Sequence, residues 1–168
     1  MKKQASAVTA EPRYSIRIEF VVAIAVVCFV SGAMIGSSFF GRSEMVAELV
    51  AVGNEAYNIN AYPVAISAYE KALKRDPRNP DVLTDTGTMY LQMGQVDTAI
   101  ARFRQAIAVD PDHANSRFNL GIAYMSGKKD FRRAAEQFRE CLSIAPEGKT
   151  AAAAKGHLEA IEKMVSKP

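Results

Sequence analysis

The feature that most limits what this chain can fold into is a pattern repeated at intervals of 34 residues. Gly53, Gly87 and Gly121 are separated by this interval. The same interval relates Ala65 to Ala99, Ala72 to Ala106, Pro77 to Pro111, Tyr69 to Phe103 and Tyr90 to Tyr124. A period of about 20 to 50 residues is typical of proteins in which similar structural units stack on one another. The sequence therefore predicts a solenoid.

Two helical segments are predicted within each period. In the second period, small and apolar residues recur at spacings of four and three along two segments: Leu83, Gly87 and Tyr90, then Ala99, Phe103 and Ala106. This spacing places the residues of each segment on one face of a helix. A proline follows each second segment and cannot continue its helix. Because one helix pair cannot bury its apolar face alone, three stacked pairs are expected to share a core.

The pattern resembles that of the tetratricopeptide repeat (TPR) family. The residues that carry the resemblance in the second period are Leu83, Thr86, Gly87, Tyr90, Ala99, Phe103, Ala106 and Pro111. The resemblance implies an all-α fold with three helix-turn-helix repeats, at 46–79, 80–113 and 114–148. The apolar periodicity of the last segment, 149–168, predicts a capping helix. The third repeat has one extra residue, which we place in the turn at 126–130.

An uncharged stretch of 22 residues, 20–41, precedes the repeats. About 20 apolar residues in a helix cross the hydrocarbon layer of a membrane. The sequence thus predicts a transmembrane signal anchor at 18–41, between a basic tail at 1–17 and a linker at 42–45. Basic residues favour the cytoplasmic side, so the repeats are expected in the periplasm, with the anchor in the bacterial inner membrane. A cleaved signal peptide with its apolar core at 21–30 is the alternative.

Small residues follow one face of the predicted span. Cys28, Gly32 and Gly36 are spaced by four, and small residues at this spacing let two membrane helices approach closely. Formation of a homodimer through this face is a hypothesis that follows from the spacing.

Catalytic, metal-binding and cofactor-binding residues are not indicated by the sequence. His113 and His157 have no second His or Cys at the spacing of metal ligands. Cys28 and Cys141 fall in the predicted span and in the predicted repeat core, so they cannot pair with each other. We therefore predict that the protein is not an enzyme and needs no cofactor or metal. The formal net charge of only +3 argues against nucleic acid as a partner.

The resemblance also implies a binding groove, because in the TPR family the first helix of each repeat lines a concave face. Transferred position by position, the predicted groove residues are Val50, Asn54, Tyr57, Asn58, Thr84, Thr88, Leu91, Gln92, Asn115, Phe118, Asn119, Ile122 and Met125. Family members that clamp a C-terminal carboxylate have Lys or Arg at three sites where this chain has Val50, Asn115 and Asn119. Only Asn54 matches their pattern, so an acidic C-terminal tail is not the expected ligand.

An apolar stripe lies within this predicted groove. Phe118, Ile122 and Met125 are spaced by four and three residues. A stripe of this kind suits an extended or helical peptide with apolar anchors, while Asn54 and Asn119 can hydrogen-bond to the peptide backbone. The alternative is that the stripe packs under the capping helix or under the chain's own linker.

Together these features predict a membrane-tethered interaction module. It would hold a partner peptide or protein in the concave groove and assist the assembly or maturation of envelope proteins. Two alternatives share the same plan. One is a self-associating scaffold that organises a membrane complex, and the other is an organelle receptor with its repeats in the cytosol.

Overall fold

The structure is a computed structural model that describes residues 37–165. Within this range the chain forms seven helices and no strand. The elements are α2 (Ser37–Asn58), α3 (Tyr62–Arg75), α4 (Pro80–Gln92), α5 (Val96–Val109), α6 (Ala114–Ile122) with its π-helical continuation η1 (Ala123–Lys128), α7 (Phe131–Ile144) and α8 (Lys149–Val165). The all-helical repeat fold predicted from the sequence is confirmed for this part of the chain.

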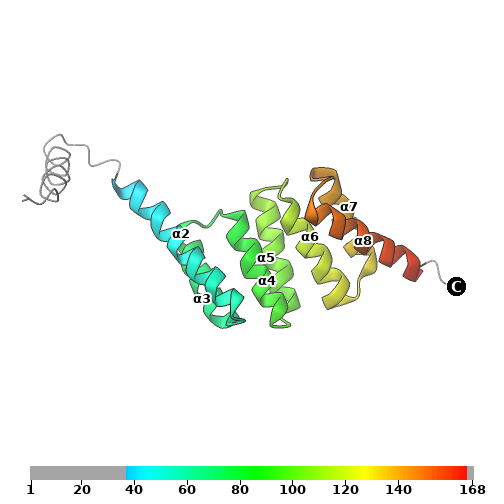
Figure 1. The fold of residues 1–168 in the computed structure, drawn as a ribbon, viewed down its shortest axis with the longest axis horizontal. Coiled ribbons are helices and arrows are strands. Elements are labelled where there is room, and N and C mark those ends of the chain that lie inside the picture. Colours follow the sequence, from blue (N-terminus) through cyan, green and yellow to red (C-terminus); the bar gives the residue numbers. More distant parts are fainter. Residues whose placement is uncertain (1–36, 166–168) are drawn as a thin grey trace, which may run out of the picture. The chain divides into compact units, whose positions relative to one another are not determined.

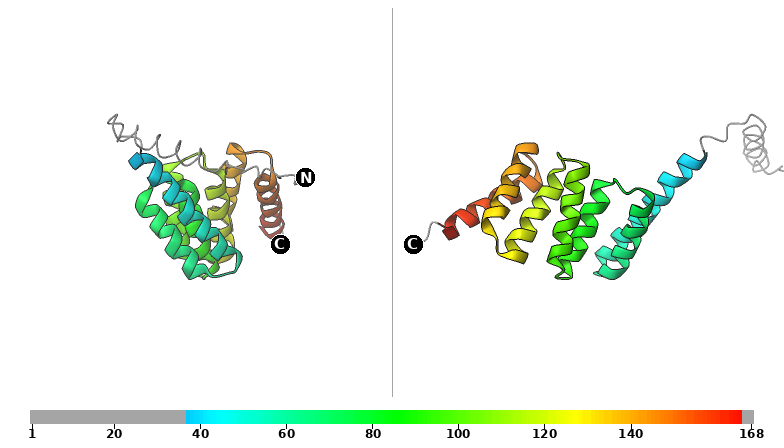
Figure 2. Two further views of the ribbon diagram at one scale, coloured as in Figure 1. Left: turned by 60° about the vertical axis from the view of Figure 1, so that its left-hand side comes forward. Right: turned by 180° about the vertical axis from the view of Figure 1, so that it is seen from behind.

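The helices form pairs, and the pairs stack in sequence order. Helix α4 packs on α5 and α6 on α7 within their repeats, while α3 contacts α4, α5 contacts α6 and α7 contacts α8 between repeats. Figures 1 and 2 show the pairs following one another along the repeat domain, with α8 after the last pair. The first helices of neighbouring repeats also touch, since α4 contacts α6.

Each helix pair is closed by a glycine that faces an aromatic ring. A Cβ added to Gly87 would lie 2.6 Å from Cε1 of Phe103, a distance that no side chain could occupy. Only glycine lets the two helices approach this closely. The three pairs are Gly53 with Tyr69, Gly87 with Phe103 and Gly121 with Phe138. The interval of 34 residues between glycines is therefore the spacing of this contact along the chain.

Helix ends follow local rules of capping. The Asn79 side chain accepts a hydrogen bond from the Val82 amide at 3.1 Å, and Pro80 occupies the first turn of α4. The Asp130 side chain accepts from the Arg133 amide at 3.0 Å at the start of α7. Helices α3 and α5 both end two residues before a proline, as the sequence predicted.

The extra residue of the third repeat is absorbed differently from the prediction. Instead of a longer turn at 126–130, residues Ala123–Lys128 continue α6 as a π-helical turn, which ends at Lys129 with a φ of 55°. Gly127 lies in this turn, and a Cβ there would be 2.5 Å from a methyl carbon of Val96. The turn is thus held against α5, where a loop would have been free to extend.

Helix α8 covers the end of the third repeat. Ala151, Ala154 and Ile161 are buried against the core that contains Phe138. Gly156 stands one repeat after Gly121 but faces open space, because nothing lies within 4 Å of a Cβ built on it. Lys155 and Glu159 are exposed on the same helix. This helix therefore has the capping role that the sequence predicted, with its outer positions polar.

The predicted N-terminal segments lie mostly outside the described residues. The basic tail, most of the span predicted at 18–41, and its small-residue face of Cys28, Gly32 and Gly36 fall within residues 1–36. Residues 42–45, predicted to be a linker, belong to α2, because no Gly or Pro breaks the helix there. Among the described helices, none is both long and apolar enough to cross a membrane.

Candidate functional site

The surface formed by the first helices of the repeats, α2, α4 and α6, carries the residues predicted to bind a partner. We call it the first-helix face. Its exposed members are Asn54, Tyr57, Asn58, Gln92 and Asn115, and its half-buried members are Val50, Thr88, Leu91, Asn119, Ile122 and Met125. Thr84 is a correction, since only 4% of this residue is exposed. Its hydroxyl hydrogen-bonds to Ser116 at 2.6 Å, so it joins two repeats and offers nothing to a ligand.

Phe118, the centre of the predicted apolar stripe, packs between the third repeat and the cap. Its ring centroid lies 5.7 Å from that of Phe138 and 5.9 Å from that of His157 in α8. His157 in turn stacks on Phe138 at 5.2 Å. Ile122 and Met125 are packed against the same core. The stripe therefore contributes to the domain's own packing in this structure, as the alternative expectation held.

A polar network that sequence reasoning missed links the second repeat to the third. His113 Nε2 lies 3.0 Å from an Asp81 carboxylate oxygen, and His113 Nδ1 lies 2.5 Å from Ser116 Oγ. The order Asp81, His113, Ser116 has the composition of a hydrolase triad. Ser116, however, is fully buried, so no substrate can reach its hydroxyl. The network is therefore a structural connection between α4 and α6.

Asp85 is the most perturbed acid on the first-helix face. Burial raises the pKa of Asp85 to about 6, the negative charge of Asp81 raises it further, and His113 opposes both. Burial is also the main cause that raises the pKa of Tyr69 to about 12, followed by the charge of Asp85. The Tyr69 hydroxyl donates a hydrogen bond to Asn54 Oδ1 at 2.7 Å. The face thus combines amide groups with carboxylates that lack a full set of counter-charges.

We expect Asp85→Asn to stabilise the protein at high pH and to have little effect at low pH. Because the folded-state pKa of Asp85 is raised to about 6, the folded protein holds a proton between the unfolded pKa and pH 6 that the unfolded chain has lost. Stability conferred by this proton is lost as pH rises through that window. After a discount for solvent screening, the gain at pH 8 is about 1 kcal/mol. Melting midpoints of both proteins across pH check this, and a gain that is equal at pH 4 and pH 8 would contradict it.

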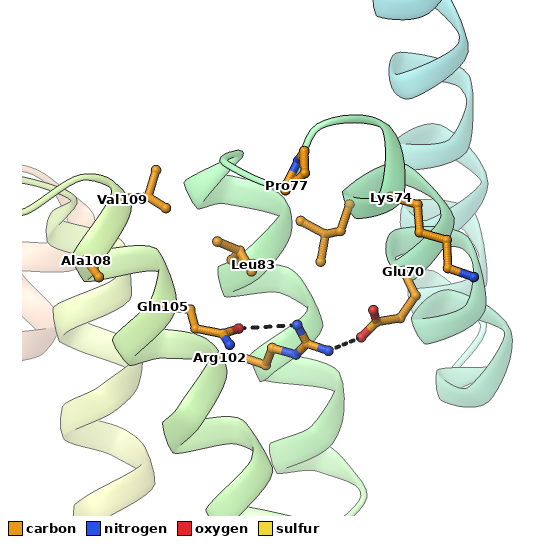
Figure 3. A pocket seen from close by; sticks show the side chains of 9 residues that line it. Glu70, Lys74, Pro77, Leu83, Arg102, Gln105, Ala108 and Val109 are labelled. Carbon is orange, nitrogen blue, oxygen red and sulfur yellow. Dashed lines mark hydrogen bonds and ion pairs between the residues drawn. The ribbon is translucent and has the colours of Figure 1, made fainter.

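A second concave site, which the sequence did not reveal, lies between the second helices α3 and α5. Figure 3 shows this pocket, which encloses about 500 Å³. Leu73, Leu83 and Val109 supply apolar surface. The Arg102 guanidinium donates hydrogen bonds to Glu70 and, at 3.2 Å, to Gln105 at one side. No motif marks the pocket, because its residues come from two repeats and three helices.

Residues suited to metal or nucleophilic chemistry do not gather in the part of the chain that the structure describes. Within residues 37–165 no group of three His, Cys, Asp or Glu side chains could hold a metal ion. Cys141 is fully buried, and burial raises the pKa of its thiol. A buried, protonated thiol is a poor nucleophile. The predictions of no enzyme activity and no cofactor stay predictions.

Comparison with known proteins identifies the repeats. Family patterns described as "Tetratricopeptide repeat" match residues 68–101 and 114–147, and one described as "TPR repeat" matches 87–127. Small glutamine-rich tetratricopeptide repeat-containing protein 2 of Mycosarcoma maydis is 31% identical over 59% of this chain and 28% of its own length. Hsp70-Hsp90 organizing protein 1 of Glycine max is 27% identical over 56% of this chain and 16% of its own length. This chain thus spans less than a third of either relative.

A solved structure shows the same fold. The first TPR domain of Spaghetti (RPAP3), bound to the HSP90 peptide SRMEEVD, superimposes with a TM-score of 0.67. It is 21% identical in sequence, and the match covers 74% of this chain and 96% of that one. At this identity the likeness concerns the fold alone.

The comparisons overturn the predicted location. We expected a single-pass protein of a bacterial inner membrane with its repeats in the periplasm. The matched relatives are instead a fungal small glutamine-rich TPR protein and a plant Hsp70-Hsp90 organizing protein, and no described helix can span a membrane. An uncharged stretch of sequence is a weaker indicator of location than the relatives of the folded repeats. The resemblance to membrane-anchored bacterial proteins, the signal anchor and the role in envelope assembly are withdrawn with it.

Proposed function

Because residues 68–147 of this chain are tetratricopeptide repeats, we propose that the protein is an interaction module that holds a peptide segment of a partner protein on its first-helix face. The observation that carries this proposal is the row of exposed amide side chains on that face: Asn54, Asn58, Gln92 and Asn115. An amide group both donates and accepts hydrogen bonds, as a peptide backbone does. Such a row suits an extended segment whose backbone groups need partners.

The charge of the face limits which peptide fits. None of the positions predicted to line it holds Lys or Arg, and its charged groups, Asp81 and Asp85, are both acidic. A peptide that ends in several carboxylates would meet like charges here, at a cost that the matching amides do not offset. The partner segment is therefore neutral or basic.

The relatives support a peptide partner and not its identity. One relative is named as an organizing protein for Hsp70 and Hsp90, and the structural neighbour holds the HSP90 peptide SRMEEVD. Of the residues that the TPR family uses to clamp such a terminus, this chain keeps only Asn54, and the Asn54 side chain already accepts a hydrogen bond from Tyr69. The use of the repeats for peptide binding is thus proposed as shared, and the carboxylate clamp as lost.

Selection from a display library of short random peptides on the full chain tests this function. We expect the enriched peptides to bind at least about tenfold more weakly to the double variant Asn58→Arg, Gln92→Arg. Both positions are exposed, so the double variant should fold normally, which its melting midpoint will show. Lys163→Glu, an exposed change on α8 outside the face, serves as the control and should leave binding unaltered. Peptides that bind equally to the face variant, or a pool dominated by acidic ends like that of SRMEEVD, would refute the proposal.

A further inference from the structure

We propose that the pocket between α3 and α5 is a second protein-docking site, which takes an apolar side chain of a partner segment together with a neighbouring carboxylate. It lies on the second helices of the repeats, whereas the proposed peptide site lies on the first helices. The argument comes from a comparison of two equivalent junctions within this chain.

The junction between repeats one and two corresponds to that between repeats two and three, residue by residue. Pro77 and Leu83 of the first junction stand 34 residues before Pro111 and Arg117 of the second. Gln105 and Glu140 stand 35 apart, because the extra residue of η1 comes between them. One substitution therefore distinguishes the centres of the two junctions: a leucine in the first and an arginine in the second.

In the second junction the Arg117 side chain occupies this centre. Its Nε and Nη2 donate hydrogen bonds to the Pro111 carbonyl oxygen at 3.2 and 3.1 Å, and its Nη1 lies 3.8 Å from a Glu140 carboxylate oxygen. Only 18% of the Arg117 side chain is exposed. A long side chain entering between the two second helices is thus an arrangement that this fold already contains.

In the first junction no side chain fills the corresponding space. Leu83 ends on the pocket floor, and a volume of about 500 Å³ remains above it (Figure 3). Leu73 and Val109 continue the apolar surface on either side. This volume lies within the range of about 300–1,000 Å³ that is usual for binding pockets. The floor therefore favours an apolar side chain, supplied by a partner as the second junction is filled by its own arginine.

The charges at the rim select an acidic neighbour for that side chain. The positive charge of Arg102 is already balanced, since its guanidinium pairs with Glu70. Lys74, which also lines the pocket, forms no ion pair with any residue in the described range. One positive charge thus remains at the rim, and a carboxylate of the partner segment would neutralise it. A partner presenting an apolar residue beside Asp or Glu matches both features.

The second junction also supplies the blocking variant. Leu83→Arg with Gln105→Glu reproduces the Arg117–Glu140 arrangement in the first junction and should fill the pocket without loss of the fold. In a selection of short random peptides on the full chain, we expect a class in which an apolar residue adjoins Asp or Glu. Binding of this class should fall at least about tenfold on the double variant. It should be unchanged on the first-helix variant Asn58→Arg, Gln92→Arg.

A second variant reads the charge alone. Lys74 is exposed, so Lys74→Glu should leave the melting midpoint unchanged while shifting the selected peptides from acidic to basic neighbours. The proposal is overturned if no peptide class is lost on the filled pocket, or if Lys74→Glu leaves the charge preference as it was. If the only class selected is lost on the first-helix variant alone, the pocket fails as a site while the proposed function stands.

Discussion

Replacing Gly121 with alanine should lower the free energy of unfolding by about 2–3 kcal/mol, the upper part of the range for overpacked cores. The new Cβ would lie 2.6 Å from Cε1 and 2.8 Å from Cδ1 of Phe138. The Phe138 ring is fully buried and is stacked on His157, so it cannot turn aside without disturbing the cap. Helices α6 and α7 must then separate. Urea denaturation followed by circular dichroism measures the loss.

The chain offers a matched control in Gly156, which stands at the corresponding position of α8. Nothing lies within 4 Å of a Cβ built there, and the residue is exposed in the interior of a helix. Gly156→Ala should therefore raise stability by about 0.5–1 kcal/mol, since alanine is the better helix former. If both substitutions moved the urea midpoint in the same direction by similar amounts, the close glycine–aromatic contact would not be what fixes the helix pairs.

Leu120→Ala should cost about 2–5 kcal/mol, the usual range for truncation of a buried leucine. Leu120 is 3% exposed and belongs to the core shared by the second and third repeats and the cap. Phe118→Ala should cost less, about 1–2 kcal/mol, because Phe118 is only half-buried while still packing on two rings. Thermal melts of the two variants, with the exposed Met164→Ala as a reference near zero, rank these contributions. A Phe118→Ala protein as stable as the wild type would place Phe118 outside the packing and return it to the binding face.

The repeat fold was predictable because its determinants recur in the sequence at a fixed interval. Gly53, Gly87 and Gly121 mark the close contacts of the helix pairs, and a proline after each second helix marks its end. Each of these signals acts within one helix or one pair. Three copies of a weak signal in register make it a strong one, and this is why the helices and the cap could be assigned without a structure.

The candidate sites were less predictable, because they depend on which residues meet across repeats. Asp81 and His113 are 32 residues apart, and nothing in either local sequence indicates that they share a hydrogen bond. The pocket of Figure 3 likewise depends on the length of one side chain at a repeat junction. The error in Thr84 had the same origin, since its position in a helix could not show that Ser116 of the next repeat would cover it.

The π-helical turn η1 separates two properties of a repeat, its length and its phase. A single residue inserted into an α-helical hairpin would rotate all that follows by about 100° about the helix axis, and Phe138 would then point away from Gly121. Here the turn takes up the extra residue before α7 begins, so the aromatic ring still meets its glycine although Phe103 and Phe138 are 35 residues apart. What the fold requires of its sequence is thus a constant phase of the facing surfaces. An insertion is tolerated wherever a local unwinding can restore that phase, and a strict period of 34 would lose the third repeat's second helix and the start of the cap.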